Sequence, residues 1–329
     1  MEVARGRHEG RGIDGSPKAG ALDVVVVAYR SATLLDECLD SIVRDVKGGT
    51  VVPARTLVIV VDNASPDDSA RVAAAHDGVR VVASPSNRGF GDGCNLGAAA
   101  GDAEYVFFVN PDARLDTGCT SRLLRELTAA PSLAAVGPAV LDPAGAYRAA
   151  SAGFEPCLRS IIGHYLLAGC LPIVGRWFAP LQLPEGTTER RPDWITGAAL
   201  LVRRAAFESV GGFDESIFLY MEDVDLCRRL REGGWGIGYV PEAVVYHQLG
   251  GTQGTDQAAR WMRSFYAYLR RRHGALYTAV CSQLAGLGLG LRAVAYAPSR
   301  PRLARRLARA AGEAIRLPIA ALYRTGADA

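Results

Sequence analysis

The sequence lacks the features that define several protein classes. Its 329 residues include seven cysteines, but none forms a CxxC pair. We therefore expect reduced thiols, as in a cytosolic protein, and not a zinc site or a disulfide framework. Residues 1–20 contain no apolar core of the signal-peptide type, and we expect them to form a disordered tail. The composition, 49% hydrophobic and 22% charged, suits one large domain with an appendage.

Lysine is absent from Arg260 to the end of the chain, and acids are scarce there. That segment carries thirteen arginines against Glu313 and Asp328, a net charge of +11, so the remainder carries −8. A basic tail on an acidic body predicts an anionic partner, either phospholipid or nucleic acid. No aromatic stacking platform accompanies the arginines, which argues against nucleic acid.

No glycine stands in the turn after the first predicted strand, which reads Ala28-Tyr29-Arg30-Ser31. A dinucleotide-binding fingerprint requires glycines at that turn. The glycine-rich stretch comes later, after the third strand, and its spacing is GxGxxxG. This pattern disfavours a dehydrogenase, and the glycines are better explained by close approach of backbone to a ligand or by tight helix packing.

Buried strands alternate with helices in the first half of the chain. The β-branched or aromatic runs are Leu22–Tyr29, Thr56–Val61, Val79–Ala83 and the run from Tyr105 that stops at Asn110-Pro111-Asp112. The alternation predicts a doubly wound α/β domain, in which ligands bind at the carboxyl ends of the strands. Those ends carry Asp62, residues 87–93 and Asp112.

Three carboxylates, Glu222, Asp223 and Asp225, open a predicted helix whose later turns carry arginines. Acids at the start of a helix and bases toward its end suit the helix dipole, which is one explanation. The alternative is an active site, because three acids within four residues, approached by Phe213, Phe218 and Tyr220, exceed what a cap requires. Two short strands follow, and the second ends at His247, which is either a packed residue or a ligand.

The remaining segments are less regular. Residues 157–185 are apolar without a clear period and are either core or a lid or interfacial segment. Residues 258–272 predict a helix, and residues 275–291 are uncharged but marginal as a spanning helix. Residues 302–317 predict a basic amphipathic helix with one apolar stripe, which either contacts an anionic membrane or packs on the body with its arginines solvated.

Together, VVVVAY, VVDNASPDDS, SNRGFGDGCNLG, FFVNPDA, TGAALLVRR, GGFDESIFLYMEDVDLCRRL and the strand end at His247 resemble the family 2 inverting glycosyltransferases of GT-A fold. More narrowly, they resemble the bacterial rhamnosyltransferase-like branch that builds cell-wall and polysaccharide linkers. The resemblance covers about residues 23–252. It implies a GT-A domain at 21–255, Rossmann-like with a mostly parallel sheet, followed by a helical, membrane-associating region at 256–329.

The resemblance also implies site residues. Donor-nucleotide contacts fall to Ala28, Tyr29, Asp62, Asn87, Arg88, Gly89, Asn110 and Asp112, with Asp62 on the base. Asp112 and His247 match the metal site for Mg²⁺ or Mn²⁺. Asp223 matches the catalytic base, with Glu222 and Asp225 able to tune or orient it. Trp194, Gly197, Phe218 and Tyr220 fall on the acceptor side. Arg30 departs from the family, many members of which have Asn there.

The expected function is metal-dependent, inverting transfer of a deoxyhexose, rhamnose from dTDP-rhamnose, to a lipid-linked or polysaccharide acceptor in cell-envelope glycan synthesis. The expected location is the cytoplasmic face of the cell membrane, reached through the basic C-terminal helix. The same chemistry with UDP-galactofuranose, a UDP-hexose or GDP-mannose is the first alternative. A non-catalytic scaffold that binds nucleotide sugars or membranes is the second.

Overall fold

The computed structural model describes residues 18–49, 55–147, 151–166, 180–248 and 257–323. The chain divides into two compact units. Unit 1 comprises residues 1–152, 185–218 and 222–252, and unit 2 comprises residues 153–184, 219–221 and 253–329. Residues 153–184, which the sequence placed in the catalytic domain, thus group with the C-terminal helices.

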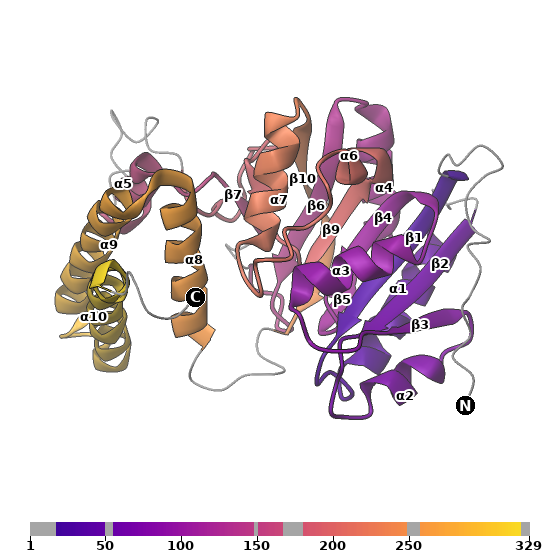
Figure 1. Ribbon diagram of the computed structural model, residues 1–329, viewed down its shortest axis with the longest axis horizontal. Coiled ribbons are helices and arrows are strands. Elements are labelled where there is room, and N and C mark those ends of the chain that lie inside the picture. The colour runs from indigo at the N-terminus through magenta and orange to yellow at the C-terminus, as the bar shows by residue number, and fades with distance from the viewer. Residues whose placement is uncertain (1–17, 50–54, 148–150, 167–179, 249–256, 324–329) are drawn as a thin grey trace. The chain divides into compact units, whose positions relative to one another are not determined.

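Unit 1 is built on an eight-stranded sheet with the order β3-β2-β1-β4-β9-β6-β10-β5 (Figure 1). Its strands are β1 (Lys18–Ala28), β2 (Arg55–Asp62), β3 (Val79–Ala83), β4 (Ala103–Val109), β5 (Ala113–Leu115), β6 (Leu133–Leu141), β9 (Ala199–Arg203) and β10 (Gly236–His247). Ala152 of β7 (Ala152–Gly153) lies in a second, two-stranded sheet with β8 (Trp194–Ile195).

Most strand pairs of the large sheet are parallel. Strands β1–β2, β2–β3, β1–β4 and β6–β10 pair in parallel. Strand β9 runs antiparallel between β4 and β6, and β5 runs antiparallel to β10. The predicted α/β fold with a mostly parallel sheet is therefore confirmed. The reversed β9 brings its first residue, Ala199, opposite Val109 at the carboxyl end of β4.

Helices cover both faces of this sheet, as the alternation of side chains along β1 shows. Val24 and Val26 pack in one buried cluster with residues of α1 (Leu35–Gly48) and α4 (Cys119–Ala129). The next residues along the strand face the other side, where α3 (Phe90–Ala99) packs so closely that a Cβ on Gly97 would lie 2.3 Å from Val25. Burial on both faces explains why the strand reads as a continuous apolar run. The other helices of unit 1 are α2 (Ser69–Ala74), α6 (Arg204–Ser209) and α7 (Glu222–Glu232).

A buried ion pair joins β1 and α6 at the amino end of the parallel strands. Arg204 Nη2 lies 2.8 Å from Asp23 Oδ2, and the same guanidinium donates to the backbone carbonyls of Ala98 and Ala103. Both side chains are almost fully buried. Because each charge is paired and hydrogen-bonded, the pair ties the two elements together at the edge opposite the loops described below.

Several elements differ from their sequence-based prediction. Strand β1 begins at Lys18, inside the predicted tail, and residues 1–17 lie outside the described part. The three-residue strand β5 was not predicted. The two short strands expected before His247 form one strand, β10, whose register shifts between Val240 and Val244. The shift surrounds Pro241, which has no N–H for the ladder.

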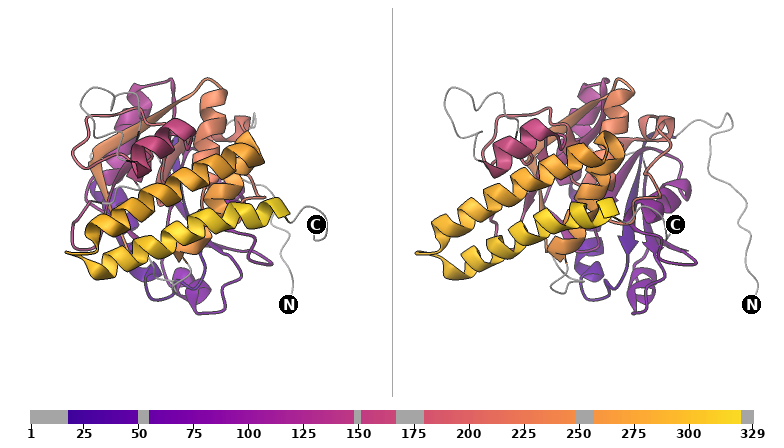
Figure 2. Two further views of the ribbon diagram at one scale, coloured as in Figure 1. Left: turned by 90° about the vertical axis from the view of Figure 1, so that its left-hand side faces the viewer. Right: turned by 60° about the vertical axis from the view of Figure 1, so that its left-hand side comes forward.

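Unit 2 contains helices α5 (Leu158–Tyr165), α8 (Gln257–His273), α9 (Ala275–Tyr296) and α10 (Pro301–Tyr323). Helices α9 and α10 lie side by side (Figure 2). A Cβ on Gly288 of α9 would lie 2.2 Å from the carbonyl oxygen of Tyr165, so α5 packs directly on α9. Within residues 157–185, α5 is thus packed within unit 2, and residues 167–179 lie outside the described residues.

Candidate active site

Asp112 and His247 meet although 135 residues separate them. Asp112 follows β4, and the next residue, Ala113, begins β5 and pairs with His247 at the end of β10. This register places His247 Nε2 2.9 Å from Asp112 Oδ1 and 3.2 Å from Asn110 Nδ2. His247 is 7% exposed. The structure thus brings together three of the predicted donor and metal residues.

The pair has the geometry of two neighbouring metal ligands. Ligands at about 2.1 Å from an octahedral cation, at right angles to each other, lie about 3 Å apart. The 2.9 Å between Asp112 Oδ1 and His247 Nε2 fits that spacing. Among the described residues no group of three or more His, Cys, Asp or Glu side chains could hold a metal. The donor set therefore fits a cation that takes its remaining ligands from phosphate oxygens and water.

Cys38 is buried and contacts the Asn110–Asp112 turn. Its Sγ is 3.4 Å from the carbonyl oxygen of Asn110, within hydrogen-bonding distance. Burial and the nearby negative charge of Asp112 raise the pKa of the Cys38 thiol far above its usual value. In these surroundings the Cys38 thiol is neutral.

The turns after β1 and β2 are fastened to each other by side chains of the second turn. Arg30 has φ 54°, and its N–H donates to Ser65 Oγ at 2.7 Å. Asp67 Oδ2 accepts the N–H of Ala32, and Asp67 Oδ1 accepts the hydroxyls of Ser65 and Ser69. Desolvation opposes ionisation, but these donors prevail and hold the pKa of Asp67 at about 2. Asp67, which was not predicted as a site residue, therefore stays charged and shapes this corner.

The predicted base-binding residues lie in these turns. Ala28 pairs with Asp62 across the ends of β1 and β2 and is fully buried, and its carbonyl accepts the N–H of Asn63 at 2.9 Å. Asp62 is half-buried, and its Oδ1 accepts the N–H of Ser65 at 3.1 Å. This bond fixes the orientation of the carboxylate. Tyr29 is partly exposed beside it.

Asn63 connects these turns to the loop after β3. It is 2% exposed, and its Nδ2 donates to Asn87 Oδ1 at 3.1 Å and to the Gly89 carbonyl at 2.9 Å. Asn87 Oδ1 also accepts the N–H of Gly89. Asn63 was missed at the sequence level, because a single Asn after a strand is indistinguishable from a turn former. Its partners show that it sets the position of the predicted donor loop.

The donor loop itself requires glycine at one position. Gly89 has φ 106°, and a Cβ there would lie 2.2 Å from the carbonyl oxygen of Phe218, which accepts the N–H of Phe90. The neighbouring Arg88 is exposed and paired with Asp92 at 3.1 Å and Glu215 at 2.9 Å. The loop is therefore held by backbone geometry, while the Arg88 guanidinium is near the surface.

Asp223 is tied to the same edge of the sheet through β9. Its Oδ2 accepts the N–H of Gly197 at 2.9 Å, and its Oδ1 accepts the N–H of Val224 at 2.8 Å. The next residue, Ala198, accepts the N–H of Asn110 at 2.9 Å. A short chain of contacts thus links the predicted base to the Asn110–Asp112 turn. The fit is close, since a Cβ on Gly197 would lie 3.2 Å from Phe90.

Glu222 and Asp223 have adjacent carboxyl groups in very different surroundings. Glu222 is 6% exposed, and its Oε2 has no hydrogen-bond partner among the residues that the structure describes. Burial, and then the charge of Asp223, raise the pKa of Glu222 to about 8. Burial also raises the pKa of Asp223, but two backbone N–H groups favour its charged form. Ionisation of the pair is therefore favoured at Asp223, which accepts the backbone N–H groups, over Glu222, whose pKa is raised by burial and by the charge of Asp223.

We expect the free energy of unfolding of Glu222→Gln to increase relative to that of the wild type as the pH rises. The pKa of Glu222 is higher in the folded protein than when unfolded, so its ionisation lowers stability between about pH 4.5 and 8. Glutamine removes this loss, and the difference in unfolding free energy should grow by up to about 1.4 kcal/mol per pH unit. Urea unfolding at pH 5 and pH 8.5 measures it, with the exposed Glu185→Gln as control. A difference that is equal at both pH values contradicts the assignment.

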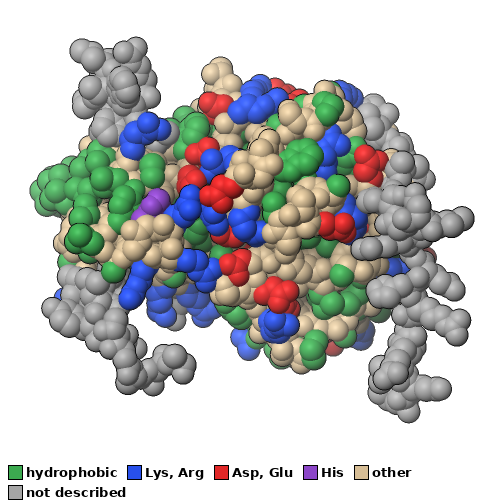
Figure 3. Space-filling view, turned by 45° about the horizontal axis from the view of Figure 1, so that its top comes forward, with side chains coloured by type: hydrophobic (Ala, Val, Ile, Leu, Met, Phe, Trp, Pro, Cys, Tyr) green, Lys and Arg blue, Asp and Glu red, His purple; other side chains and the backbone are tan. Residues whose placement is uncertain are grey.

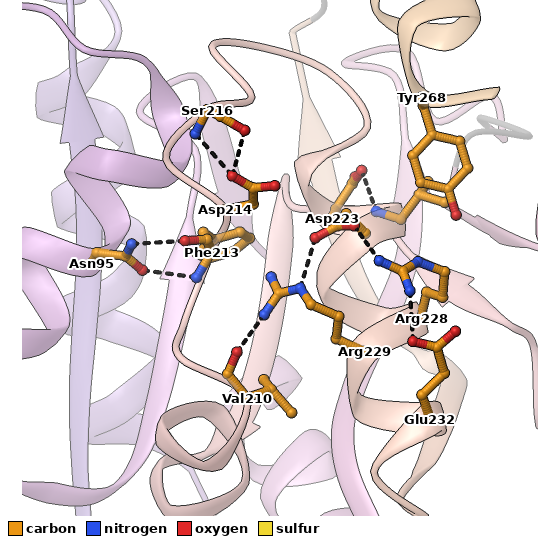
Figure 4. Close-up of polar contacts among 12 residues, drawn as sticks. Asn95, Val210, Phe213, Asp214, Ser216, Asp223, Arg228, Arg229, Glu232 and Tyr268 are labelled. Atoms are coloured by element: carbon orange, nitrogen blue, oxygen red, sulfur yellow. Dashed lines mark hydrogen bonds and ion pairs between the residues drawn. The ribbon is translucent and has the colours of Figure 1, made fainter. Parts of the chain in front are cut away.

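Asp225 does not share the environment of its neighbours. Its two carboxylate oxygens are each 2.7 Å from an arginine of the same helix, Arg228 Nη2 and Arg229 Nε. Figure 4 shows these arginines continuing to Glu232 and to the carbonyl of Val210. With both oxygens engaged, Asp225 holds α7 together, as the helix-dipole explanation expects, and the predicted tuning role is not supported.

The predicted acceptor-side residues separate into different environments. Trp194 is 8% exposed, so its ring packs in the interior, whereas Phe218 is 55% exposed. The loop that carries Phe218 is clamped by Asn95, whose amide exchanges two hydrogen bonds of 2.9 Å with the backbone of Phe213 (Figure 4). Tyr220 belongs to unit 2 and has φ 66°. In unit 1, Phe218 is exposed, and the N–H of Gly197 contacts Asp223.

The fold and this edge of polar loops are those of an enzyme of GT-A type, and the comparisons agree. A mannosyltransferase from Pyrobaculum calidifontis, solved with GDP-Man and Mn²⁺, aligns over 94% of this chain and 88% of its own with TM-score 0.59 and 16% identity. GalNAc-T7, solved with UDP, GalNAc and Mn²⁺, aligns over 77% and 51% with TM-score 0.51 and 14% identity. At these identities the likeness shows the fold alone.

Sequence comparison identifies the family. Residues 23–169 match the family model "Glycosyl transferase family 2", and residues 185–310 match "Glycosyl transferase family group 2". The chain is 32% identical to N-acetylglucosaminyl-diphospho-decaprenol L-rhamnosyltransferase of Mycobacterium tuberculosis, over 78% of this chain and 87% of the relative. It is 33% identical to the pre-mycofactocin glycosyltransferase of that species, over 64% and 40%. The chain belongs to glycosyltransferase family 2, and the predicted resemblance is confirmed.

Proposed function

We propose that the chain transfers L-rhamnose from dTDP-rhamnose to a lipid-linked or polysaccharide acceptor, with inversion and with a divalent cation, in cell-envelope glycan synthesis. One observation carries the catalytic part. Asp223 is held by the Gly197 N–H, and the next residue, Ala198, is bonded to the turn that carries Asp112. A base and a pair of metal-type ligands are thus fixed at one edge, as attack on a sugar nucleotide requires.

The donor occupies the carboxyl ends of β1 to β4 in this proposal. Asp62, oriented by Ser65, accepts from the nucleotide base, and Tyr29 lines the base and ribose. The loop at Gly89, whose position is set by Asn63 and by packing of Gly89 against Phe218, lies next to the donor in this proposal. Asp112 and His247 would hold Mg²⁺ or Mn²⁺, and when bound the cation neutralises the charge of the departing diphosphate.

Asp223 acts as general base. Its carboxylate accepts the proton of the acceptor hydroxyl as that oxygen attacks the anomeric carbon and the bond from the sugar to the diphosphate breaks. A single displacement of this kind inverts the anomeric centre. The Gly197 and Val224 N–H groups keep the carboxylate charged and aimed, and the raised pKa of Glu222 disfavours a competing charge next to it.

The rhamnosyl donor is supported by the relative of 32% identity, whose name specifies L-rhamnosyl transfer. Calorimetry of the full chain with Mn²⁺ or Mg²⁺ tests this part of the proposal by comparing dTDP, UDP and GDP. We expect metal-dependent binding of dTDP at least tenfold tighter than that of the other two. Preference for UDP or GDP would keep the chemistry and replace the donor by UDP-galactofuranose, a UDP-hexose or GDP-mannose.

The acceptor is proposed to be a lipid carrying a diphosphate-linked sugar, because the same relative is named for such an acceptor. An acceptor of this kind lies in a bilayer, so we place the protein on the inner face of the cell membrane as a peripheral enzyme. The basic C-terminal segment, with thirteen arginines against two acids, supports attraction to anionic lipids. The non-catalytic scaffold remains the alternative if none of the three nucleotides binds.

A further inference from the structure

The exposed apolar side chains of the described residues gather on one helix. Phe218 aside, the large hydrophobic residues that are exposed all belong to α9: Leu276 (79%), Val280 (44%), Leu287 (54%), Leu291 (58%), Val294 (75%) and Tyr296 (39%). The space-filling view shows hydrophobic side chains concentrated on part of the surface (Figure 3). A single exposed leucine is ordinary, but six such residues on one helix need an explanation.

These residues form a stripe. At 100° per residue, the positions 276, 280, 287, 291 and 294 fall within roughly 60° of arc around α9. The opposite face carries Cys281, Ala285 and Gly288, which are buried against the rest of unit 2. We call Leu276, Val280, Leu287, Leu291 and Val294 the α9 stripe. The helix is therefore packed on one side and apolar toward solvent on the other.

The neighbouring helix α10 has the reverse arrangement. Its small residues Ala304, Ala311 and Ala314 are buried, and Ile315 packs against Gly286 of α9. Of the apolar stripe predicted for this helix, Ala314 is buried and Leu303, Leu307 and Ala310 are partly buried. The solvent-exposed side chains of α10 are mostly charged, and they include Arg302, Arg305, Arg306, Arg309 and Arg316.

We propose that the α9 stripe is the membrane-facing surface of the protein and lies in the boundary between headgroups and acyl chains of an anionic bilayer. The arginines of α10 contact lipid phosphates in this arrangement. This inference rests on the proposed peripheral location. It assigns insertion into the bilayer to α9 and not to α10, the helix that the sequence analysis indicated. Apolar side chains that enter the acyl region and arginines that meet phosphate are complementary to one kind of surface, a phospholipid bilayer.

Two features of unit 2 favour a helix that lies in the interface. Helix α9 is the one described helix long and apolar enough to cross a bilayer, which by itself is weak evidence. Its packed face buries Thr278 and Ser282, and Arg292 donates to the carbonyl of His164 on α5. Spanning the bilayer would carry these polar groups and their partner helix into hydrocarbon, whereas interfacial binding leaves them in place.

A second copy of the chain is a poorer occupant of the α9 stripe. The segment from Arg260 onward carries a net charge of +11, so two copies joined through this unit would bring like charges together. The exposed arginines of α10 fit a polyanionic surface better than they fit a second set of arginines. Dimerisation is therefore an outcome that the experiment must detect, not the occupant that we propose.

The test is co-sedimentation of the full chain with vesicles of phosphatidylcholine and phosphatidylglycerol. Leu287→Asp/Leu291→Asp should reduce the bound fraction at least about tenfold, because each carboxylate would enter the acyl boundary. Ala74→Asp/Ala99→Asp adds the same charge at exposed positions of α2 and α3, in unit 1 and away from both the stripe and the arginines of α10. This control should stay within about threefold of the wild type, and melting followed by circular dichroism checks that both variants fold.

Wild-type binding by Leu287→Asp/Leu291→Asp would overturn the proposal, as would an equal loss in the control. A wild type that is dimeric by light scattering, with a monomeric stripe variant of unchanged vesicle binding, would assign the stripe to a second copy. Asp223→Asn separates this inference from the proposed chemistry. It should bind vesicles like the wild type. Failure of the predicted vesicle-binding results therefore counts against the α9 stripe, whereas failure of the transfer assay counts against the proposed chemistry.

Discussion

Asp223→Asn is expected to lower the turnover of sugar transfer by about 10³-fold, within the range that general-base removal causes. The amide cannot accept the proton of the acceptor hydroxyl. It still offers one oxygen to the Gly197 N–H, which Asp223 Oδ2 now accepts at 2.9 Å. Donor binding should therefore remain within about threefold. Initial rates of transfer and calorimetric titration of the donor nucleotide give the two quantities.

Glu232→Gln is the matched control for this variant. Glu232 ends the same helix, is half-exposed and pairs with Arg228, so the substitution removes an equal charge away from Gly197. Its turnover should stay within about twofold of the wild type. Full turnover of Asp223→Asn would show that another group removes the proton, whereas loss of donor binding together with turnover would indicate a disturbed fold.

Asp112→Asn is expected to abolish the part of nucleotide binding that depends on the cation. The amide is uncharged, and the pairing of Asp112 Oδ1 with His247 Nε2 at 2.9 Å is the arrangement that we assign to the cation. Because a bound cation is worth several kcal/mol to a diphosphate, nucleotide affinity in Mn²⁺ should fall about 100-fold or more. Calorimetry with and without EDTA measures the change.

In the wild type, EDTA should weaken nucleotide binding, whereas in Asp112→Asn binding should already be weak and insensitive to EDTA. Asp116→Asn is the control, because Asp116 lies just beyond β5 and is not next to His247 in the sheet register. It should keep both the affinity and its dependence on the cation. Wild-type behaviour of Asp112→Asn would remove the metal assignment and leave the donor loops without a cation.

The sequence predicts most of the strands that build the site, because each is a buried run ended by a recognisable turn. The β-branched run in β1 and the stop at Asn110-Pro111 are local signals, and the structure has strands there. By contrast, nothing local in the sequence of β9 indicates that it runs antiparallel between β4 and β6. Pairing of Ala113 with His247 depends on strand order across the whole sheet, so only the family resemblance placed Asp112 and His247 together.

Charge patterns were ambiguous for a different reason. Glu222, Asp223 and Asp225 are equivalent acids on paper, but Asp223 receives two backbone N–H groups, Glu222 is buried, and Asp225 is bound by two arginines. These surroundings come from tertiary contacts. Likewise, the amphipathic pattern of α10 could not show which of its apolar residues pack on another helix, and in the structure Ile315 packs against Gly286 of α9.

In the proposed mechanism this site transfers a sugar by direct displacement from a nucleotide donor. NMR analysis of the product formed from dTDP-β-L-rhamnose, Mg²⁺ and a lipid carrying diphosphate-linked N-acetylglucosamine tests this mechanism. We expect one added rhamnose whose anomeric configuration is opposite to that of the donor. A product with retained configuration, or release of dTDP without any transfer to the lipid, would contradict it.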